Sequence, residues 1–235
     1  MKVAIFGAGT MGSGIAQVFA AKGHTALMYA SSVASAQKHK DKLAASLQKR
    51  VEKGKMTQEA KDALMANVLV EEKSAAADAD LIIECVKEDM ATKKALLNEL
   101  DAMCKDSAIF ASNTSSLSVT EMGNGLKHPV IGMHFFNPVP SMKLVEVIRG
   151  ANTTQETFDY IFNLAKEIGK DPIEVAEAPG FVVNKILIPM INEAIGLVET
   201  GVASAADIDK AMQLGANHPM GPLALGDFIG LDVCL

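Results

Sequence analysis

The sequence predicts an α/β protein with a Rossmann-type doubly wound sheet, followed by a smaller domain made only of helices. Two patterns favour this fold class. Over the first half of the 235 residues, short apolar runs alternate with longer stretches of helical periodicity, which is the βαβ order of a doubly wound fold. The runs are almost continuously apolar, as in strands that are buried on both faces of a parallel sheet.

The predicted strands are runs rich in Val, Ile, Leu and Phe. In order, they are Val3–Phe6, Ala26–Tyr29, Val68–Glu71, Leu81–Val86, Ala108–Ser112, Val130–Met133, Leu144–Ile148 and Ile173–Val175. Helical stretches between them are Gly12–Lys22, Val33–Lys53, Thr57–Ala66, Met90–Met103 and Thr154–Ile168. The carboxyl ends of such strands form the edge at which doubly wound sheets bind ligands.

From Pro179 onward every pattern is helical, so we expect an α/β domain over 1–178 and a helical domain over 179–235. Pro179 suits the first turn of a helix, and Pro189 is expected to kink that helix or to free a carbonyl. The predicted helices are Pro179–Glu199, Ala203–Leu214 and one that begins at Pro222. The last run, Phe228–Leu235, resembles a helix that stops early, so we expect the helical domain to be incomplete.

Composition excludes several classes of protein. The formal net charge of −6 argues against a nucleic-acid binder. No stretch approaches the roughly 20 apolar residues that a membrane span needs. The cysteines are odd in number and form no C-x-x-C pair, so they predict reduced thiols and no metal site in a cytoplasmic protein.

The strongest local motif is the glycine loop Gly7-Ala8-Gly9-Thr10-Met11-Gly12. It follows the first predicted strand and opens the first helix, which is the context of a dinucleotide pyrophosphate site. Gly7 permits the tight turn, Gly9 permits close approach of the backbone, and Gly12 permits helix–strand packing. The loop therefore predicts a site for the diphosphate of a dinucleotide cofactor.

The end of the second strand usually carries an acid that binds the adenosine ribose. Ala30 occupies that place here and is followed by Ser31 and Ser32. An acid would repel a 2′-phosphate, so its absence leaves NADP open beside NAD, although no Arg stands next to it. Either serine could bond either cofactor.

His134 is the candidate acid/base because it follows the sixth predicted strand at the ligand-binding edge. Glu146 lies in the next apolar strand, where an unpaired carboxylate would be costly. A His134–Glu146 pair satisfies this carboxylate and orients the imidazole. A salt bridge to Lys143 satisfies it equally well, and the spacing leaves both open.

Two further groups of polar residues accompany this pair. The segment Ser112–Ser116 follows the fifth strand, where it could cap a helix before Leu117 or place hydroxyls on a substrate. Asn184 stands alone among apolar residues and needs a partner. Seven basic residues suit a polyphosphate tail or a solvated helix face: Lys38, Lys40, Lys42, Lys49, Arg50, Lys53 and Lys55.

Five strings together resemble the 3-hydroxyacyl-CoA dehydrogenase family, especially its short-chain 3-hydroxybutyryl-CoA members from butyrate-forming anaerobes. They are GAGTMGSGIAQ, SNTSSLS, GMHFFNPVPSMKLVEV, APGFVVNKILIPMINEA and GANHPMGPLALGDFIGLD. The resemblance covers essentially the whole chain. It implies reversible hydride transfer between NAD(P)H and acetoacetyl-CoA in butyrate or fatty-acid metabolism, by a homodimer without nucleic-acid or membrane partners.

The resemblance also implies roles for individual residues. His134 would be the acid/base, Glu146 its partner, and Ser115 and Asn184 the groups that hold substrate oxygens. Residues expected near the nicotinamide half of the cofactor are Glu88, Lys93, Asn113 and Asn137. Ser46 and Lys53 match positions that contact coenzyme A.

The sequence departs from the family at Ala30, where an Asp is usual, and by ending several tens of residues early. Three alternatives stay open: the same reaction on longer acyl chains, a non-catalytic protein of the same fold, and a dehydrogenase for a free hydroxy acid. The last would require an Arg for the carboxylate, for which Arg149 is the candidate.

Overall fold

The computed structural model describes residues 1–234, and Val233 by its backbone alone. Its elements run β1 (Lys2–Phe6), α1 (Thr10–Ala20), β2 (Thr25–Tyr29), α2 (Val33–Glu52), α3 (Gln58–Ala66), β3 (Val68–Leu69), the 3-10 helix η1 (Lys73–Ala76), β4 (Leu81–Glu84), α4 (Met90–Met103), β5 (Ile109–Ser112), α5 (Val119–Gly123), β6 (Val130–Phe135), β7 (Leu144–Arg149), α6 (Gln155–Glu167), β8 (Asp171–Ala176), α7 (Val183–Glu199), α8 (Ala205–Gly215), α9 (Pro222–Ile229) and α10 (Leu231–Cys234). They form two compact units, Met1–Phe181 and Val182–Leu235.

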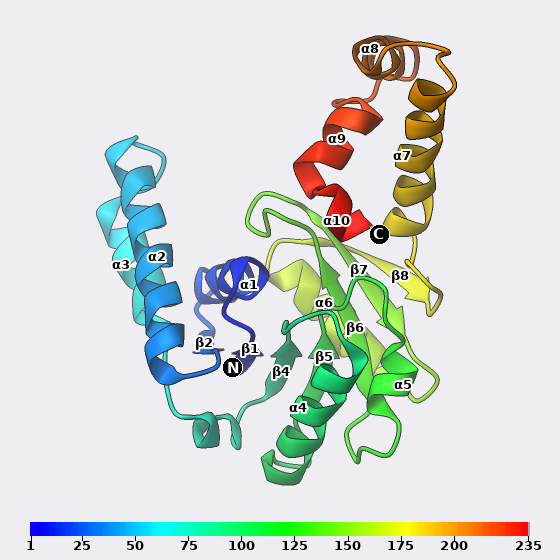
Figure 1. The fold of residues 1–235 in the computed structure, drawn as a ribbon. Helices are drawn as coiled ribbons and strands as arrows, with labels where there is room; N and C mark the ends of the chain where they lie inside the picture. Colours follow the sequence, from blue (N-terminus) through cyan, green and yellow to red (C-terminus); the bar gives the residue numbers. More distant parts are fainter. Residues whose placement is uncertain (235) are drawn as a thin grey trace. The chain divides into compact units, whose positions relative to one another are not determined.

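The first unit is built on a sheet with the strand order β3-β2-β1-β4-β5-β6-β7-β8 (Figure 1). Strands β1 to β6 are parallel, β7 is antiparallel to β6, and β8 is parallel to β7. This confirms the predicted Rossmann-type sheet. The change of direction at β7 was not part of the prediction, because apolar runs do not encode strand direction.

Both faces of the sheet are covered by apolar clusters, as the continuous apolar runs predicted. In β1, alternate residues belong to different clusters: Val3 and Ile5 to one, and Ala4 and Phe6 to the other. Helices α1, α2, α3 and α6 contribute to the first cluster, and α4 and α5 to the second. The sheet is therefore held between two layers, with its carboxyl edge left for the loops.

Several predicted boundaries were wrong. Strand β6 continues to Phe135, so His134 lies inside this strand and not beyond it, because β7 pairs with β6 as far as Phe135. Strand β4 ends at Glu84 because the Val86 N–H bonds the Glu84 carboxylate. Strand β3 is shorter than predicted, and β8 is longer.

The second unit consists of α7 to α10 among the described residues, which confirms a helical domain. Pro179 does not lie in the first turn of α7, which begins only at Val183. Gly180 and Phe181 have positive φ angles of 76° and 52°, which a right-handed helix excludes. Pro189 lies inside α7 as predicted. The final Leu235 of the predicted last helix lies outside the described residues. No helix of the described chain is long and apolar enough to cross a membrane.

Candidate active site

The His134–Glu146 pair joins two neighbouring strands. The two residues are direct partners in the antiparallel β6–β7 register, and His134 Nδ1 lies 2.7 Å from Glu146 Oε2. Glu146 is fully buried and the His134 side chain is 7% exposed. A buried carboxylate is an acceptor, so it fixes the proton on Nδ1 and leaves Nε2 as the nitrogen for proton exchange. The geometry favours the predicted pair over a Glu146–Lys143 salt bridge.

Two aromatic rings flank the imidazole. The ring centroids of Phe136 and Phe181 lie 4.4 Å and 5.7 Å from that of His134. Phe181 is itself buried and adopts a left-handed backbone conformation. Sequence reasoning singled out neither ring. Such packing restricts the rotamers of His134 and limits its contact with water.

A buried ion pair lies at the carboxyl ends of β4 and β5. Lys93 Nζ lies 2.7 Å and 2.8 Å from the two carboxylate oxygens of Glu84, and both side chains are almost completely buried. Ser112 donates a further hydrogen bond of 2.6 Å to the same carboxylate. Lys93 was predicted from the resemblance, whereas Glu84 was missed, although an acid within an apolar strand is the signal that singled out Glu146.

Glu88 continues this network to the segment Ser112–Ser116. Lys93 Nζ lies 3.1 Å from Glu88 Oε2, and Glu88 Oε1 accepts hydrogen bonds from Thr114 Oγ1 at 2.5 Å and the Ser115 N–H at 2.8 Å. Burial raises the pKa of Glu88, but the Thr114 hydrogen bond and the Lys93 ammonium outweigh it, so the pKa lies below its usual value. An ionised Glu88 therefore holds the backbone at Ser115 in place.

Asn113 follows β5, and Asn137 lies in the loop after β6. The Asn113 side-chain oxygen accepts a hydrogen bond from the Phe135 N–H at 2.8 Å, and the Asn113 backbone N–H donates to the Glu84 carbonyl. The loop before Ser115 is thereby tied to the strand that carries His134. The predicted cap of a helix at Leu117 is only partly right: Thr114 caps the Leu117 N–H, but α5 begins at Val119 behind Ser118.

The glycine loop forms the wall of a cavity of about 550 Å³ at the ends of β1, β2 and β4. Gly7 has a φ of 107°, and a Cβ there would lie 2.3 Å from the Cys85 carbonyl oxygen. A Cβ on Gly12 would lie 2.0 Å from the Gly7 oxygen, whereas one on Gly9 would meet nothing within 4 Å. The space at Gly9 is open, and the first N–H groups of α1, which begins at Thr10, have no acceptor within the helix, so the loop fits a pyrophosphate.

Ala30 and Ser31 line the same cavity beside the glycine loop. Ser32 does not face it as a lining residue, because it is the N-cap of α2 and its hydroxyl accepts the Ser35 N–H. Burial raises the pKa of the Cys85 thiol well above its usual value, so this lining residue stays protonated. His39 of α2 lines the cavity too.

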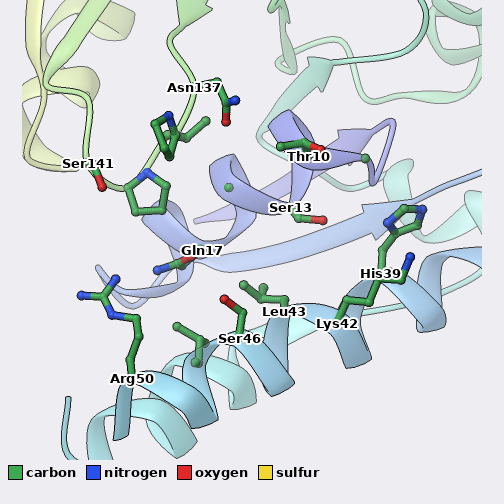
Figure 2. Close-up of a pocket in the computed structure, with 16 residues that line it drawn as sticks. Thr10, Ser13, Gln17, His39, Lys42, Leu43, Ser46, Arg50, Asn137 and Ser141 are labelled. Carbon is green, nitrogen blue, oxygen red and sulfur yellow. The ribbon is translucent and has the colours of Figure 1, made fainter. Parts of the chain in front are cut away.

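A second cavity, of about 490 Å³, lies between α1, α2 and the loop after β6 (Figure 2). One face of α2 supplies His39, Lys42, Ser46 and Arg50, spaced by one helical turn. The polar groups opposite them are Ser13, Gln17, Asn137 and Ser141. No described lining residue is acidic, so the cavity suits an anionic ligand.

Only some of the residues that were predicted to contact coenzyme A or the substrate line this cavity. Ser46 lines this cavity, but Lys53 does not and is instead the C-cap of α2. Of the basic stretch, Lys42 and Arg50 line the cavity, while Lys38, Lys49 and Lys55 lie on exposed parts of the chain. Ser115 belongs to the network around Glu88, and Asn184 stands in the first turn of α7 in the second unit.

The chain matches family descriptions over both units. Residues 2–178 match "3-hydroxyacyl-CoA dehydrogenase, NAD binding domain", and residues 180–235 match "3-hydroxyacyl-CoA dehydrogenase, C-terminal domain". A "3-hydroxybutyryl-CoA dehydrogenase" of Clostridioides difficile is 54% identical over 100% of this chain and 85% of its own. The "Hydroxyacyl-coenzyme A dehydrogenase, mitochondrial" of Rattus norvegicus is 42% identical over 98% of this chain and 76% of its own.

A solved structure agrees with these matches. The (S)-3-hydroxybutyryl-CoA dehydrogenase PaaH1 from Ralstonia eutropha superposes with a TM-score of 0.94 at 44% identity, covering 99% of this chain and 83% of that one. The resemblance predicted from the five sequence strings is therefore confirmed.

Proposed function

Since the chain belongs to the 3-hydroxyacyl-CoA dehydrogenase family, we propose that it interconverts (S)-3-hydroxybutyryl-CoA and acetoacetyl-CoA with a nicotinamide cofactor. The observation that carries this proposal is the buried His134–Glu146 pair at 2.7 Å, on β6 and β7 of the sheet whose strand β1 leads into the glycine loop. Reduction of a ketone needs a hydride and a proton, and the pair is built to handle the proton.

The chemistry divides between cofactor and protein. The nicotinamide, when bound, exchanges a hydride with the C3 atom of the substrate. His134 Nε2 donates a proton to the C3 oxygen during reduction and withdraws it during oxidation. Glu146 holds Nδ1 protonated, and it stabilises the imidazolium that forms when Nε2 takes the proton.

Ser115 and Asn184 are proposed to hold the oxygen atoms of the substrate. The support for Ser115 is the Glu88 carboxylate, which fixes its N–H at 2.8 Å and orients the loop. Asn184 is included because of its family position at the start of α7. Fixed hydrogen-bond donors near the reacting oxygen stabilise charge that develops there without further reorganisation.

Coenzyme A is proposed to bind in the cavity along α2. Lys42 and Arg50 on its wall would attract the phosphates, and Ser46 between them would donate a hydrogen bond. Lys53 at the end of the same helix would act on the phosphates through its charge alone. A cavity with this lining favours a thioester that carries phosphates over a free hydroxy acid, and Arg149, the candidate for a free carboxylate, does not line it.

The cofactor is proposed to be NAD or NADP, bound by the glycine loop with Ala30 and Ser31 near the adenosine. Glu88, Lys93, Asn113 and Asn137 would shape the nicotinamide side. We further propose a homodimer in butyrate or fatty-acid metabolism in the cytoplasm, acting without nucleic-acid or membrane partners. Sedimentation equilibrium tests the dimer, and a monomer at micromolar concentration would refute it.

The direct test is acetoacetyl-CoA reduction, followed by the loss of nicotinamide absorbance. Free acetoacetate serves as the control substrate, and 3-oxoacyl-CoA compounds of increasing chain length define the acyl preference. We expect turnover of acetoacetyl-CoA and at least a hundredfold lower kcat/KM for acetoacetate. Equal turnover of the two would contradict the role of the α2 cavity.

A further inference from the structure

The rim of the cofactor cavity lacks the charge that usually selects a free ribose hydroxyl. The Tyr29 carbonyl accepts the N–H groups of Gly7 and Ala8, both at 2.9 Å, so the next residue, Ala30, lies beside the glycine loop. Ala30 is one of the residues that line the cavity. An acid at this place would bond the 2′-hydroxyl and repel a 2′-phosphate, and a methyl group does neither.

The whole wall of the cavity is free of acidic side chains among the described residues. It contains Lys73 and Lys87 as cations, and His39 and the two serines Ser31 and Ser35 as hydrogen-bonding groups. The chain as a whole has a formal net charge of −6, so the positive charge of the cavity wall is opposite in sign to the net charge of the protein. A wall of this composition favours an additional negative charge on the ligand.

The hydrogen-bonding groups Ser31, Ser35 and His39 follow Ala30 in the chain and line the same cavity. Ser35 and His39 are one turn apart on α2, so both project from one helix face, and Ser31 precedes the N-cap of that helix. The hydroxyl of a serine and the N–H of an imidazole are donors for phosphate oxygens. Ser32 is engaged as the cap and is left out of this set.

Lys73, from the 3-10 helix η1, supplies a positive charge to the wall of the cavity. Its Nζ lies 2.7 Å from a carboxylate oxygen of Glu99, with side chains that are 45% and 55% exposed. Exposed ion pairs of this kind contribute little, so a phosphate with nearly two negative charges can compete for the ammonium. Lys73 therefore remains usable by a ligand in the cavity.

We propose that Ser31, Ser35, His39 and Lys73 form a binding site for the 2′-phosphate of NADP, with Ala30 as the residue that admits it. This inference rests on the proposed function, because it specifies which nicotinamide cofactor that site uses. It predicts that NADP binds more tightly than NAD, contrary to what an acid at position 30 would produce.

The test is calorimetric binding of two fragments, 2′,5′-ADP and 5′-AMP, which differ only in the phosphate and need no turnover. We expect 2′,5′-ADP to bind at least tenfold more tightly. Equal or weaker binding of 2′,5′-ADP would overturn the site. NADH-dependent reduction of acetoacetyl-CoA would still test the proposed function separately.

Three variants locate the effect. Ala30→Asp is expected to lower 2′,5′-ADP affinity at least tenfold while 5′-AMP affinity is kept or rises. Lys73→Met should lower only 2′,5′-ADP affinity, by about threefold to tenfold. Lys38→Met removes the same charge from an exposed position of α2 that does not line the cavity, and should change neither. A loss that is equal in Lys73→Met and Lys38→Met would overturn the assignment of Lys73.

Discussion

The two halves of the sheet edge differ in what shapes them. Around β1 and β2 the cavity is formed mainly by backbone. A Cβ on Gly7 or Gly12 would clash with backbone atoms, whereas the space beside Gly9 is open. Around β4 to β7 the site is held by side chains, with buried contacts of Lys93 to Glu84 and of His134 to Glu146. The first half can accept a ligand by shape, while the second places charges at fixed positions.

This difference matters because the two kinds of site respond differently to substitution. A buried charge network loses far more when one member is removed than when both are replaced. A backbone cradle responds to the volume of a single Cβ. Substitutions in each half therefore test whether the comparison is right.

Lys93→Met should have the largest effect on stability. It leaves the fully buried Glu84 carboxylate without its cation, which costs about 3–5 kcal/mol of unfolding free energy. Urea denaturation measures the loss. The matched double variant Glu84→Gln/Lys93→Met should recover most of it, and a double variant as unstable as Lys93→Met would refute the pair.

Glu146→Gln should lower kcat by about a hundredfold, or roughly 3 kcal/mol, because it removes the charge that stabilises the imidazolium. The amide keeps nearly the same volume in a fully buried position. Steady-state reduction of acetoacetyl-CoA gives kcat and KM separately. A change confined to KM would contradict the orienting role of Glu146.

Gly12→Ala and Gly9→Ala form a matched pair on the backbone side. Gly12→Ala should cost about 1–3 kcal/mol of stability, because its Cβ would lie 2.0 Å from the Gly7 oxygen. Gly9→Ala should change stability by less than about 1 kcal/mol. Yet it should weaken dinucleotide binding, because its methyl group enters the open space. Tryptophan is absent, so circular dichroism follows unfolding and calorimetry follows binding. Loss of stability in Gly9→Ala, together with loss of binding alone in Gly12→Ala, would contradict the steric roles given to these two glycines.

Asp101→Asn should have the smallest effect. Burial raises the pKa of Asp101, but hydrogen bonds from the His128 ring and from the N–H groups of Lys127 and His128 outweigh it, so the pKa is lowered. A lowered carboxyl pKa stabilises the fold above the unfolded value of about 3.9, and this is lost as the pH falls through the lower folded value.

The amide should therefore cost no more than about 1 kcal/mol at neutral pH and should flatten the acid slope of stability. Urea titrations at several pH values between about 7 and 3 measure that slope. An unchanged slope would show that Asp101 does not contribute in this way.

The same division explains what the sequence could predict. The glycine loop was predictable because its constraint is local: strand, turn and helix follow one another along the chain. His134 and Glu146 were predictable as candidates, but their spacing left the pair open beside a Glu146–Lys143 salt bridge, and the antiparallel register of β6 and β7, which apolar runs do not encode, favours the pair. Glu84 was missed, although an acid within a predicted apolar strand is the same signal that singled out Glu146. Its cation, Lys93, comes from the following helix.

The start of α7 was mispredicted for a related reason. Pro179 fits a first helical turn by propensity, but Gly180 and Phe181 take left-handed conformations. That choice places the Phe181 ring 5.7 Å from the His134 ring. A tertiary contact thus accompanies a backbone conformation that local preference would not select.

The most direct test of this account is a single-turnover measurement of acetoacetyl-CoA reduction by His134→Ala, with enzyme in excess and cofactor affinity measured on the same sample. We expect a rate at least about a hundredfold below that of the unchanged protein. It also predicts cofactor affinity within about twofold, because His134 is absent from the lining of the dinucleotide cavity. A rate near that of the unchanged protein would contradict the proton-transfer role on which the account rests.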